Sequence, residues 1–159
     1  MFNTTEEYIR EMHASFKKAE HSMFVSLKYT RTVDVIKNLV DRFVETISYG
    51  IEGLTLELEN KNEILVVPDT LIEKIGILRE KFKEDEKIME CLDFILFLRK
   101  VSRSEHGKCE EFRKNVTMVA VVEGEEHNIN IPVLQEYLEK TKSYLKIFEE
   151  LALGKKEED

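Results

Sequence analysis

VDVIKNLVDRFVETISYGIEGLTLELEN, residues 33–60, is the stretch of sequence that decides the fold. Apolar side chains recur in it at every third or fourth position, as they do on one face of an α-helix. These residues are Ile36, Val40, Phe43, Ile47, Ile51, Leu54 and Leu58. Charged and amide side chains fall on the opposite side, so the pattern predicts one long amphipathic helix over about 33–60.

Two glycines, Gly50 and Gly53, lie within this apolar face. Each costs a helix about 1 kcal/mol relative to alanine. We therefore expect another backbone to approach the helix closely at this point.

The same periodicity predicts a helix over roughly 5–29, with Thr4 or Thr5 as its cap. The β-branched and polar residues that follow, 29–32, form either a bend or a continuation of that helix. Pro68-Asp69-Thr70 marks the start of a third helix, and a fourth is predicted over about 86–105.

The fourth helix carries the densest apolar block of the chain, residues 91–98, so we expect it to be the central core helix. Asp93 within that block lines up with Glu86, Glu90 and Lys100 at 100° per residue. This alignment predicts a narrow solvent-exposed strip.

Beyond Gly107 the apolar period changes from that of a helix to that of a strand. Alternating residues on both sides of a Glu-Gly-Glu-Glu turn predict one β-hairpin over about 115–131. A last helix then starts at Pro132 and is stopped by Gly154. The tail, 155–159, is expected to fray. The sequence thus predicts a single, mainly α domain over 1–159: an up-down bundle of about five helices with one β-hairpin before the last.

Composition places the protein in a class and a setting. The chain has 159 residues, 24 Lys and Arg, and 32 Asp and Glu, which gives a net charge of −8. The abundance of Glu and Lys beside a single Gln favours a thermophile. No apolar run reaches the roughly 18 residues of a membrane helix, and Cys91 and Cys109 lack the spacing of a metal or redox site. We expect a soluble cytoplasmic protein with reduced thiols.

Most catalytic motifs are absent from the sequence. It contains no glycine-rich phosphate loop, no GxSxG and no HExxH, and no histidine follows a glutamate by three residues. We therefore expect no metal and no cofactor. His13, His21 and His127 are interpreted as ordinary surface or boundary histidines.

The segment 99–114 differs from the rest of the chain because it carries six basic and three acidic residues. If the fourth helix continues through Glu105, Arg99, Arg103 and His106 project from the face that carries Ile88, Leu92 and Ile95. One interpretation is an anion site for an RNA phosphodiester: His106 moves a proton, an arginine stabilises the transition state, and the ribose 2′-hydroxyl is the nucleophile, with no metal needed. The other is that the helix emerges from the core here, its arginines pairing with Glu105, Glu110 or Glu111.

The stretch Arg99-Lys-Val-Ser-Arg-Ser-Glu-His106 resembles the Arg-x(4–6)-His motif of the HEPN superfamily. These are helical bundles that often dimerise and include metal-independent ribonucleases and nucleotide-binding partners of toxin–antitoxin systems. The layout of the predicted helices over about 5–155 is similar, although the hairpin lies outside the common core. The resemblance implies that Arg99 and His106 are the catalytic pair, with Arg103 as a helper.

Two further questions stay open at the level of sequence. Arg31 and Asp34 either pair in a hinge between the first two helices, or Tyr29 and Arg31 lie beside His106. If the long apolar faces exceed what one chain buries, a homodimer completes the core. The function expected is RNA binding or metal-independent endoribonuclease activity, with RNA or a nucleotide as ligand. The alternative is a non-enzymatic helical dimer that serves as a protein–protein interaction module.

Overall fold

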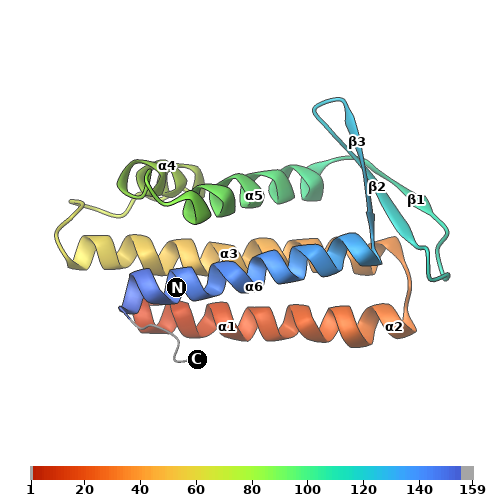
Figure 1. The fold of residues 1–159 in the computed structure, drawn as a ribbon, viewed down its shortest axis with the longest axis horizontal. Coiled ribbons are helices and arrows are strands. Elements are labelled where there is room, and N and C mark those ends of the chain that lie inside the picture. The colour runs from red at the N-terminus through yellow and green to blue at the C-terminus, as the bar shows by residue number, and fades with distance from the viewer. Residues whose placement is uncertain (1, 155–159) are drawn as a thin grey trace.

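In the computed structural model, which describes residues 2–154, the helix predicted over 33–60 is present as α3 (Val33–Asn60). Its apolar face is at most 4% exposed. This helix packs against four others (Figure 1): α1 (Thr5–His21), α4 (Leu71–Lys81), α5 (Glu86–Arg103) and α6 (Ile131–Leu153). The prediction that the fourth helix is central is therefore wrong. α3 is central because its neighbours cover it on several sides, whereas α5 keeps an exposed strip.

Gly50 and Gly53 are explained by close packing, but against side chains. A Cβ atom at Gly50 would lie 2.5 Å from Cδ2 of Phe148 on α6, and one at Gly53 would lie 3.2 Å from Cβ of Tyr8 on α1. The expectation of an approaching backbone is thus wrong. The missing Cβ atoms make room for a phenylalanine ring and for the first turn of α1.

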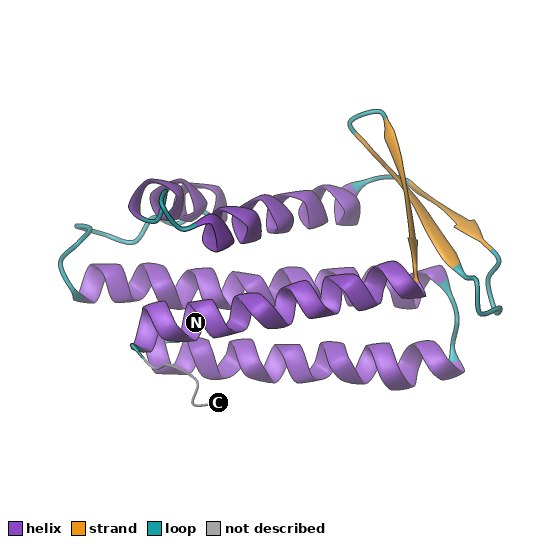
Figure 2. Cartoon of the chain, viewed as in Figure 1, coloured by secondary structure: helices purple, strands orange, loops and turns teal. Residues whose placement is uncertain are grey.

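The predicted helix over 5–29 is confirmed, with one irregularity. α1 is capped by the Thr4 side chain and passes through a π-helical turn (Ser22–Ser26) into α2 (Leu27–Tyr29). The chain then bends through 30–32, the loop that joins two helices at one end of the bundle (Figure 2), and the Thr32 side chain caps α3. Of the two alternatives for 29–32, the bend is the one observed.

α5 ends two residues before the predicted boundary. Asp85 caps its start, and Ser104, with an extended backbone, caps its end, so Glu105 and His106 lie outside the helix. The exposed strip is confirmed: the Asp93 side chain is 71% exposed and pairs with Arg79 at 2.6 Å.

The β-structure is a three-stranded antiparallel sheet, ordered β1 (His106–Cys109), β2 (Thr117–Val122), β3 (Glu125–Asn130). The predicted hairpin corresponds to β2 and β3, and β1 was not predicted. Met118, Ala120, Val122 and Ile129 are buried against the bundle. Asn130 caps the start of α6, and Gly154, with φ +70°, caps its end. The predicted fraying of 155–159 falls outside the described residues.

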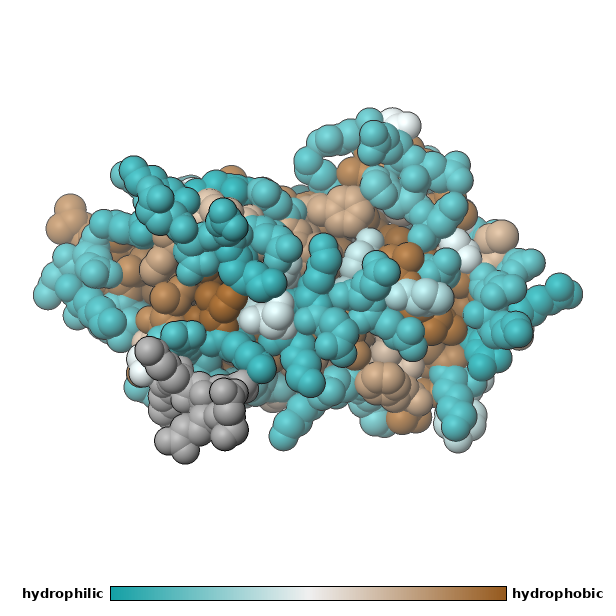
Figure 3. All heavy atoms as spheres, viewed as in Figure 1, coloured by the Kyte–Doolittle hydropathy of each residue, from teal (hydrophilic) through white to brown (hydrophobic). Residues whose placement is uncertain are grey.

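Both long apolar faces are buried within this one chain. They therefore need no second copy to cover them. Within residues 2–154, no helix combines the length and the apolar character needed to cross a membrane. The face shown in Figure 3 is mostly hydrophilic, with apolar atoms reaching the surface toward both ends. Cys91 is buried, Cys109 is exposed, and both are free.

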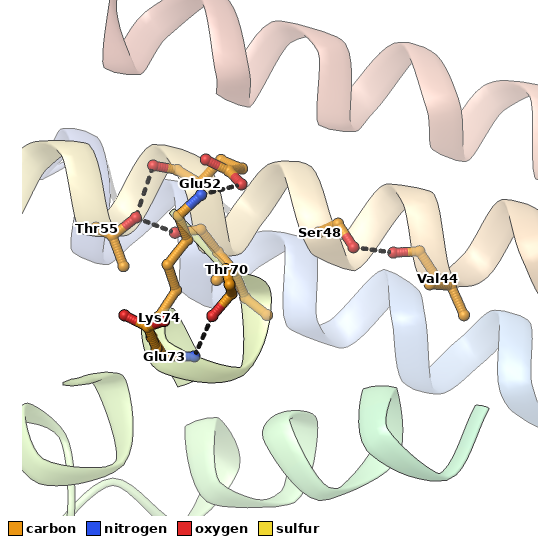
Figure 4. A network of polar contacts seen from close by, with 8 residues as sticks. Val44, Ser48, Glu52, Thr55, Thr70, Glu73 and Lys74 are labelled. Atoms are coloured by element: carbon orange, nitrogen blue, oxygen red, sulfur yellow. Dashed lines mark hydrogen bonds and ion pairs between the residues drawn. The ribbon is translucent and has the colours of Figure 1, made fainter. Parts of the chain in front are cut away.

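An ion pair with a buried lysine fastens α4 to α3 (Figure 4). Lys74 extends from α4 and donates to Glu52 of α3 at 2.6 Å, and its own side chain is only 9% exposed. Thr70 caps α4 by accepting from the backbone N–H of Glu73 at 3.2 Å.

Candidate anion-binding site

Arg99 and Arg103 lie one helical turn apart at the end of α5. Arg99 is partly buried and Arg103 is exposed. Burial lowers the pKa of the Arg99 guanidinium, and the positive charge of Arg103 lowers it further. Two like charges thus act on each other where one of them has lost part of its hydration.

No carboxylate in the described part of the chain pairs with either arginine. Within residues 2–154, the side chain of neither Arg99 nor Arg103 forms an ion pair or a hydrogen bond. Of the three acids predicted as partners, Glu111 instead accepts from the Val33 backbone N–H at 2.9 Å and pairs loosely with Lys108 at 3.9 Å. The ion pairs expected by the second interpretation of this segment are therefore not formed.

The end of α5 is held in place by a different acid. The Ser102 hydroxyl, which lies between the two arginines in sequence, donates to Asp41 of α3. Asp41 also pairs with Lys37 at 3.0 Å. This hydrogen bond ties the end of α5 to α3, and Lys37 offsets part of the charge of the carboxylate.

His106 does not lie on the helix face that the sequence predicts. It is the first residue of β1, directly opposite Ala120 on β2. Residues opposite one another in a sheet share a face, and Ala120 is buried, so His106 lies on the inner face toward the bundle. The predicted alignment with Arg99 and Arg103 fails because the helix ends at Arg103.

The His106 ring carries a buried atom with no partner. Its Nδ1 forms no hydrogen bond with any residue that the structure describes. A buried polar atom in this state costs about 1–3 kcal/mol unless a water or a ligand satisfies it. His127 lies opposite Ala120 on β3. Unlike the His106 ring, its ring has an aromatic neighbour, because it packs edge-on against Phe97 with centroids 4.9 Å apart.

Arg31 is a second basic residue with an unsatisfied atom. Its Nε is buried without a partner in the described part of the chain. Its carbonyl accepts from the Phe112 backbone N–H at 2.7 Å, so the bend after α2 lies against the loop that follows β1. Arg31 and Asp34 do not pair, so the predicted hinge contact is absent. Sequence reasoning offered no signal for the contact with Phe112, because it joins residues far apart in the chain.

A neighbouring groove suits phosphate less well. It occupies about 420 Å³ between α5 and the β2–β3 turn, and its charged lining residues include Asp93, Lys100, Glu123 and Glu125. Lys100 pairs with Glu123 at 2.5 Å and lowers the pKa of that carboxyl. Acidic groups dominate this lining. A second hollow of about 330 Å³ shares Lys100 and Glu123 with this groove and is also lined by Arg103, which is therefore open to a ligand.

Among residues 2–154, no three His, Cys, Asp or Glu side chains are arranged to hold a metal ion. Comparison of the chain with protein-family models, with curated proteins and with solved structures gives no match.

Proposed function

We propose that this protein binds RNA and cleaves its phosphodiester bonds without a metal ion, at the end of the bundle where α5 meets β1. The observation that carries the proposal is Arg99, a partly buried guanidinium beside Arg103 with no carboxylate partner in the described chain. A phosphodiester supplies the missing negative charge, and its paired oxygens match the fork of a guanidinium.

His106 supplies the chemistry that the arginines lack. An imidazole can accept the proton of a ribose 2′-hydroxyl, whose oxygen then attacks the adjacent phosphorus. The bond to the 5′-oxygen breaks, and that oxygen takes a proton from water, leaving a 2′,3′-cyclic phosphate and a 5′-hydroxyl. Arg99 and Arg103 stabilise the extra negative charge of the pentavalent transition state. The resemblance of Arg99–His106 to the HEPN motif supports this division of roles, as does the unpartnered Nδ1 of His106.

The test is cleavage of end-labelled RNAs of mixed sequence by the purified protein in the presence of EDTA. We expect cyclic-phosphate products from the wild type and none from Arg99→Ala or His106→Ala. Arg10→Ala and His13→Ala, which remove the same residue types from α1, serve as matched controls and keep full activity. A folded wild-type protein that leaves every RNA intact would sink the proposal.

A second candidate function, a protein–protein interaction module, is favoured by a different surface. Leu65, Val66 and Ile72 are 101%, 69% and 55% exposed, at the end of the bundle where α3 joins α4. Large apolar side chains left exposed in neighbouring segments favour a contact with another protein. If the surface joins two copies of this chain, Leu65→Asp converts a dimer to a monomer in sedimentation and leaves RNA cleavage unchanged.

Composition supports the setting proposed for this activity. Two free thiols and a surface rich in Glu and Lys suit a cytoplasmic protein of an organism that grows at high temperature.

A further inference from the structure

Three exposed aromatic side chains belong to segments that meet at the sheet end of the bundle. Phe24 is 58% exposed, Tyr29 is 78% exposed and Phe112 is 76% exposed. Phe24 and Tyr29 belong to the last turns before the bend, and Phe112 lies in the loop between β1 and β2. That loop lies against the bend, because Phe112 donates to the Arg31 carbonyl and Glu111 accepts from the Val33 N–H. Figure 1 shows it beside α2.

The helical part of this surface is a second stripe on an already amphipathic helix. Met23 and Leu27 continue the buried stripe, at 5% and 1% exposed. Phe24, Lys28 and Tyr29 are all exposed, and Lys28 Nζ lies 5.8 Å from the centre of the Tyr29 ring. The π-helical turn (Ser22–Ser26) falls within this stripe. Such turns occur often at functional sites.

Phe112 is held in solvent by a strained backbone. Its φ is +67°, in the left-handed region that bulky residues avoid. Glu110 in the same loop also has a positive φ, +53°. A strained residue persists only where its surroundings fix it, and here the hydrogen bonds to the bend do so. The backbone strain at Phe112 thus costs free energy, and the ring that it exposes does not pack into the core.

The charge around the three rings is positive in an acidic protein. Residues 28–34 and 108–114 together carry five basic and three acidic side chains, whereas the whole chain has a net charge of −8. Lys28, Arg113 and Lys114 form no ion pair within the described chain. Proteins bind single-stranded nucleic acid with two kinds of side chain: aromatic rings, on which the bases stack, and cations, which contact the phosphates.

We propose that Phe24, Tyr29 and Phe112 form a stacking surface for the bases of single-stranded RNA. This inference rests on the proposed function, because it assigns the substrate class of that same site. β1 links the two: it runs from His106 to Cys109, about 10 Å at the rise of a strand, and the loop with Phe112 follows. An RNA strand whose bases stack on the rings therefore extends toward His106 and the two arginines.

The test measures binding and cleavage separately. Binding of a fluorescein-labelled, mixed-sequence 12-nucleotide RNA is followed by anisotropy in the His106→Ala background, so that the ligand stays intact. We expect Tyr29→Ala and Phe112→Ala each to weaken binding by about 5- to 150-fold, the range for removing one stacked base contact. Phe112→Tyr, which keeps an aromatic face, retains binding, and so does Leu65→Ala at the opposite end.

Cleavage by chains that keep His106 separates this surface from the proposed chemistry. A dinucleotide too short to reach from His106 to Phe112 is cleaved equally by the wild type and by Phe112→Ala, whereas the longer strand is cleaved with a raised KM. If the wild type cleaves or binds RNA and both alanine variants bind RNA as tightly as their parent, the stacking surface is overturned and the proposed function stands. Wild type that neither binds nor cleaves overturns both. Alanine variants that change a dimer into a monomer, with RNA binding unchanged, assign the surface to contact between copies.

Discussion

Replacement of Gly50 by alanine tests how α3 is packed, because two opposed effects act at that position. Alanine favours an α-helix over glycine by about 1 kcal/mol. The new Cβ, however, would lie 2.5 Å from the ring of Phe148, about 1 Å inside the optimal carbon–carbon separation. Overpacking of a core costs about 1–3 kcal/mol. Phe148 is completely buried and cannot swing into solvent, so the overpacking cost exceeds the helical gain, and we expect Gly50→Ala to destabilise the protein by up to about 2 kcal/mol in net terms.

Gly76 provides the matched control. It lies within α4, it is exposed, and a Cβ there meets nothing within 4 Å. Gly76→Ala therefore gains the helical preference alone, about 1 kcal/mol. Thermal unfolding followed by circular dichroism is a sufficient assay, since 1 kcal/mol shifts Tm by about 2–4 °C in a chain of this size. We expect Gly76→Ala to raise Tm and Gly50→Ala to lower it.

A double-mutant cycle identifies the cause. In a Phe148→Leu background, the smaller side chain leaves room for the new methyl group, and Gly50→Ala becomes neutral or stabilising. The coupling energy between the two sites then equals the overpacking cost that is removed, about 1–3 kcal/mol, in the range for residues in contact. The reasoning is refuted if Gly50→Ala stabilises the wild type as much as Gly76→Ala does, or if the cycle shows no coupling.

Three further predictions follow from the packing and the titrating groups. Lys74→Ala leaves the partly buried Glu52 carboxylate without its cation and lowers the free energy of unfolding, measured in urea, by about 1–3 kcal/mol. Lys100→Ala breaks only a surface ion pair and, as the control, leaves Tm unchanged. The thiol of Cys91 is buried, and its pKa is raised by that burial, whereas Cys109 is exposed; a thiol reagent at pH 8 therefore labels one cysteine in the native protein and two after unfolding, and equal labelling rates contradict the packing around Cys91. Burial, together with the hydrogen bond to Glu90, raises the pKa of Tyr144 far above 10. Above pH 10 the unfolded state loses this proton and the folded state keeps it, so stability falls as pH rises; the fall is shallower in Tyr144→Phe, and identical slopes would contradict the burial of this hydroxyl.

The sequence predicted best those elements whose signals are local. The bounds of α3 matched because Thr32 caps its start and its apolar period is unbroken over the full length. The end of α5 was misplaced because it is set by a distant contact, the pairing of His106 with Ala120. β1 was missed for the same reason: its residues are polar and mostly exposed, and only pairing with β2 makes them a strand.

The candidate site was predictable in composition but not in geometry. The basic character of 99–114 is visible in the sequence, and so is the placement of Arg99 near the interior. The absence of carboxylate partners for Arg99 was not predictable, because Glu111 is engaged by the backbone of Val33, 78 residues away. The exposure of Phe112 likewise follows from a hydrogen bond to Arg31 that no local pattern indicates.

An acidic protein can bind a polyanion only if its negative charge lies far from the site or is neutralised beside it. α3 has 28 residues and is about 42 Å long at 1.5 Å per residue. The Debye length is about 8 Å at physiological ionic strength, so acids at the far end of the bundle lie several screening lengths from Arg99. Near the site, Asp41 is paired with Lys37. Glu111 accepts a hydrogen bond from the Val33 N–H and pairs loosely with Lys108. The potential that a phosphate meets there is thus set by the charges within a few screening lengths, Arg99, Arg103 and the exposed Glu105 among them, and the net charge of the chain does not decide it.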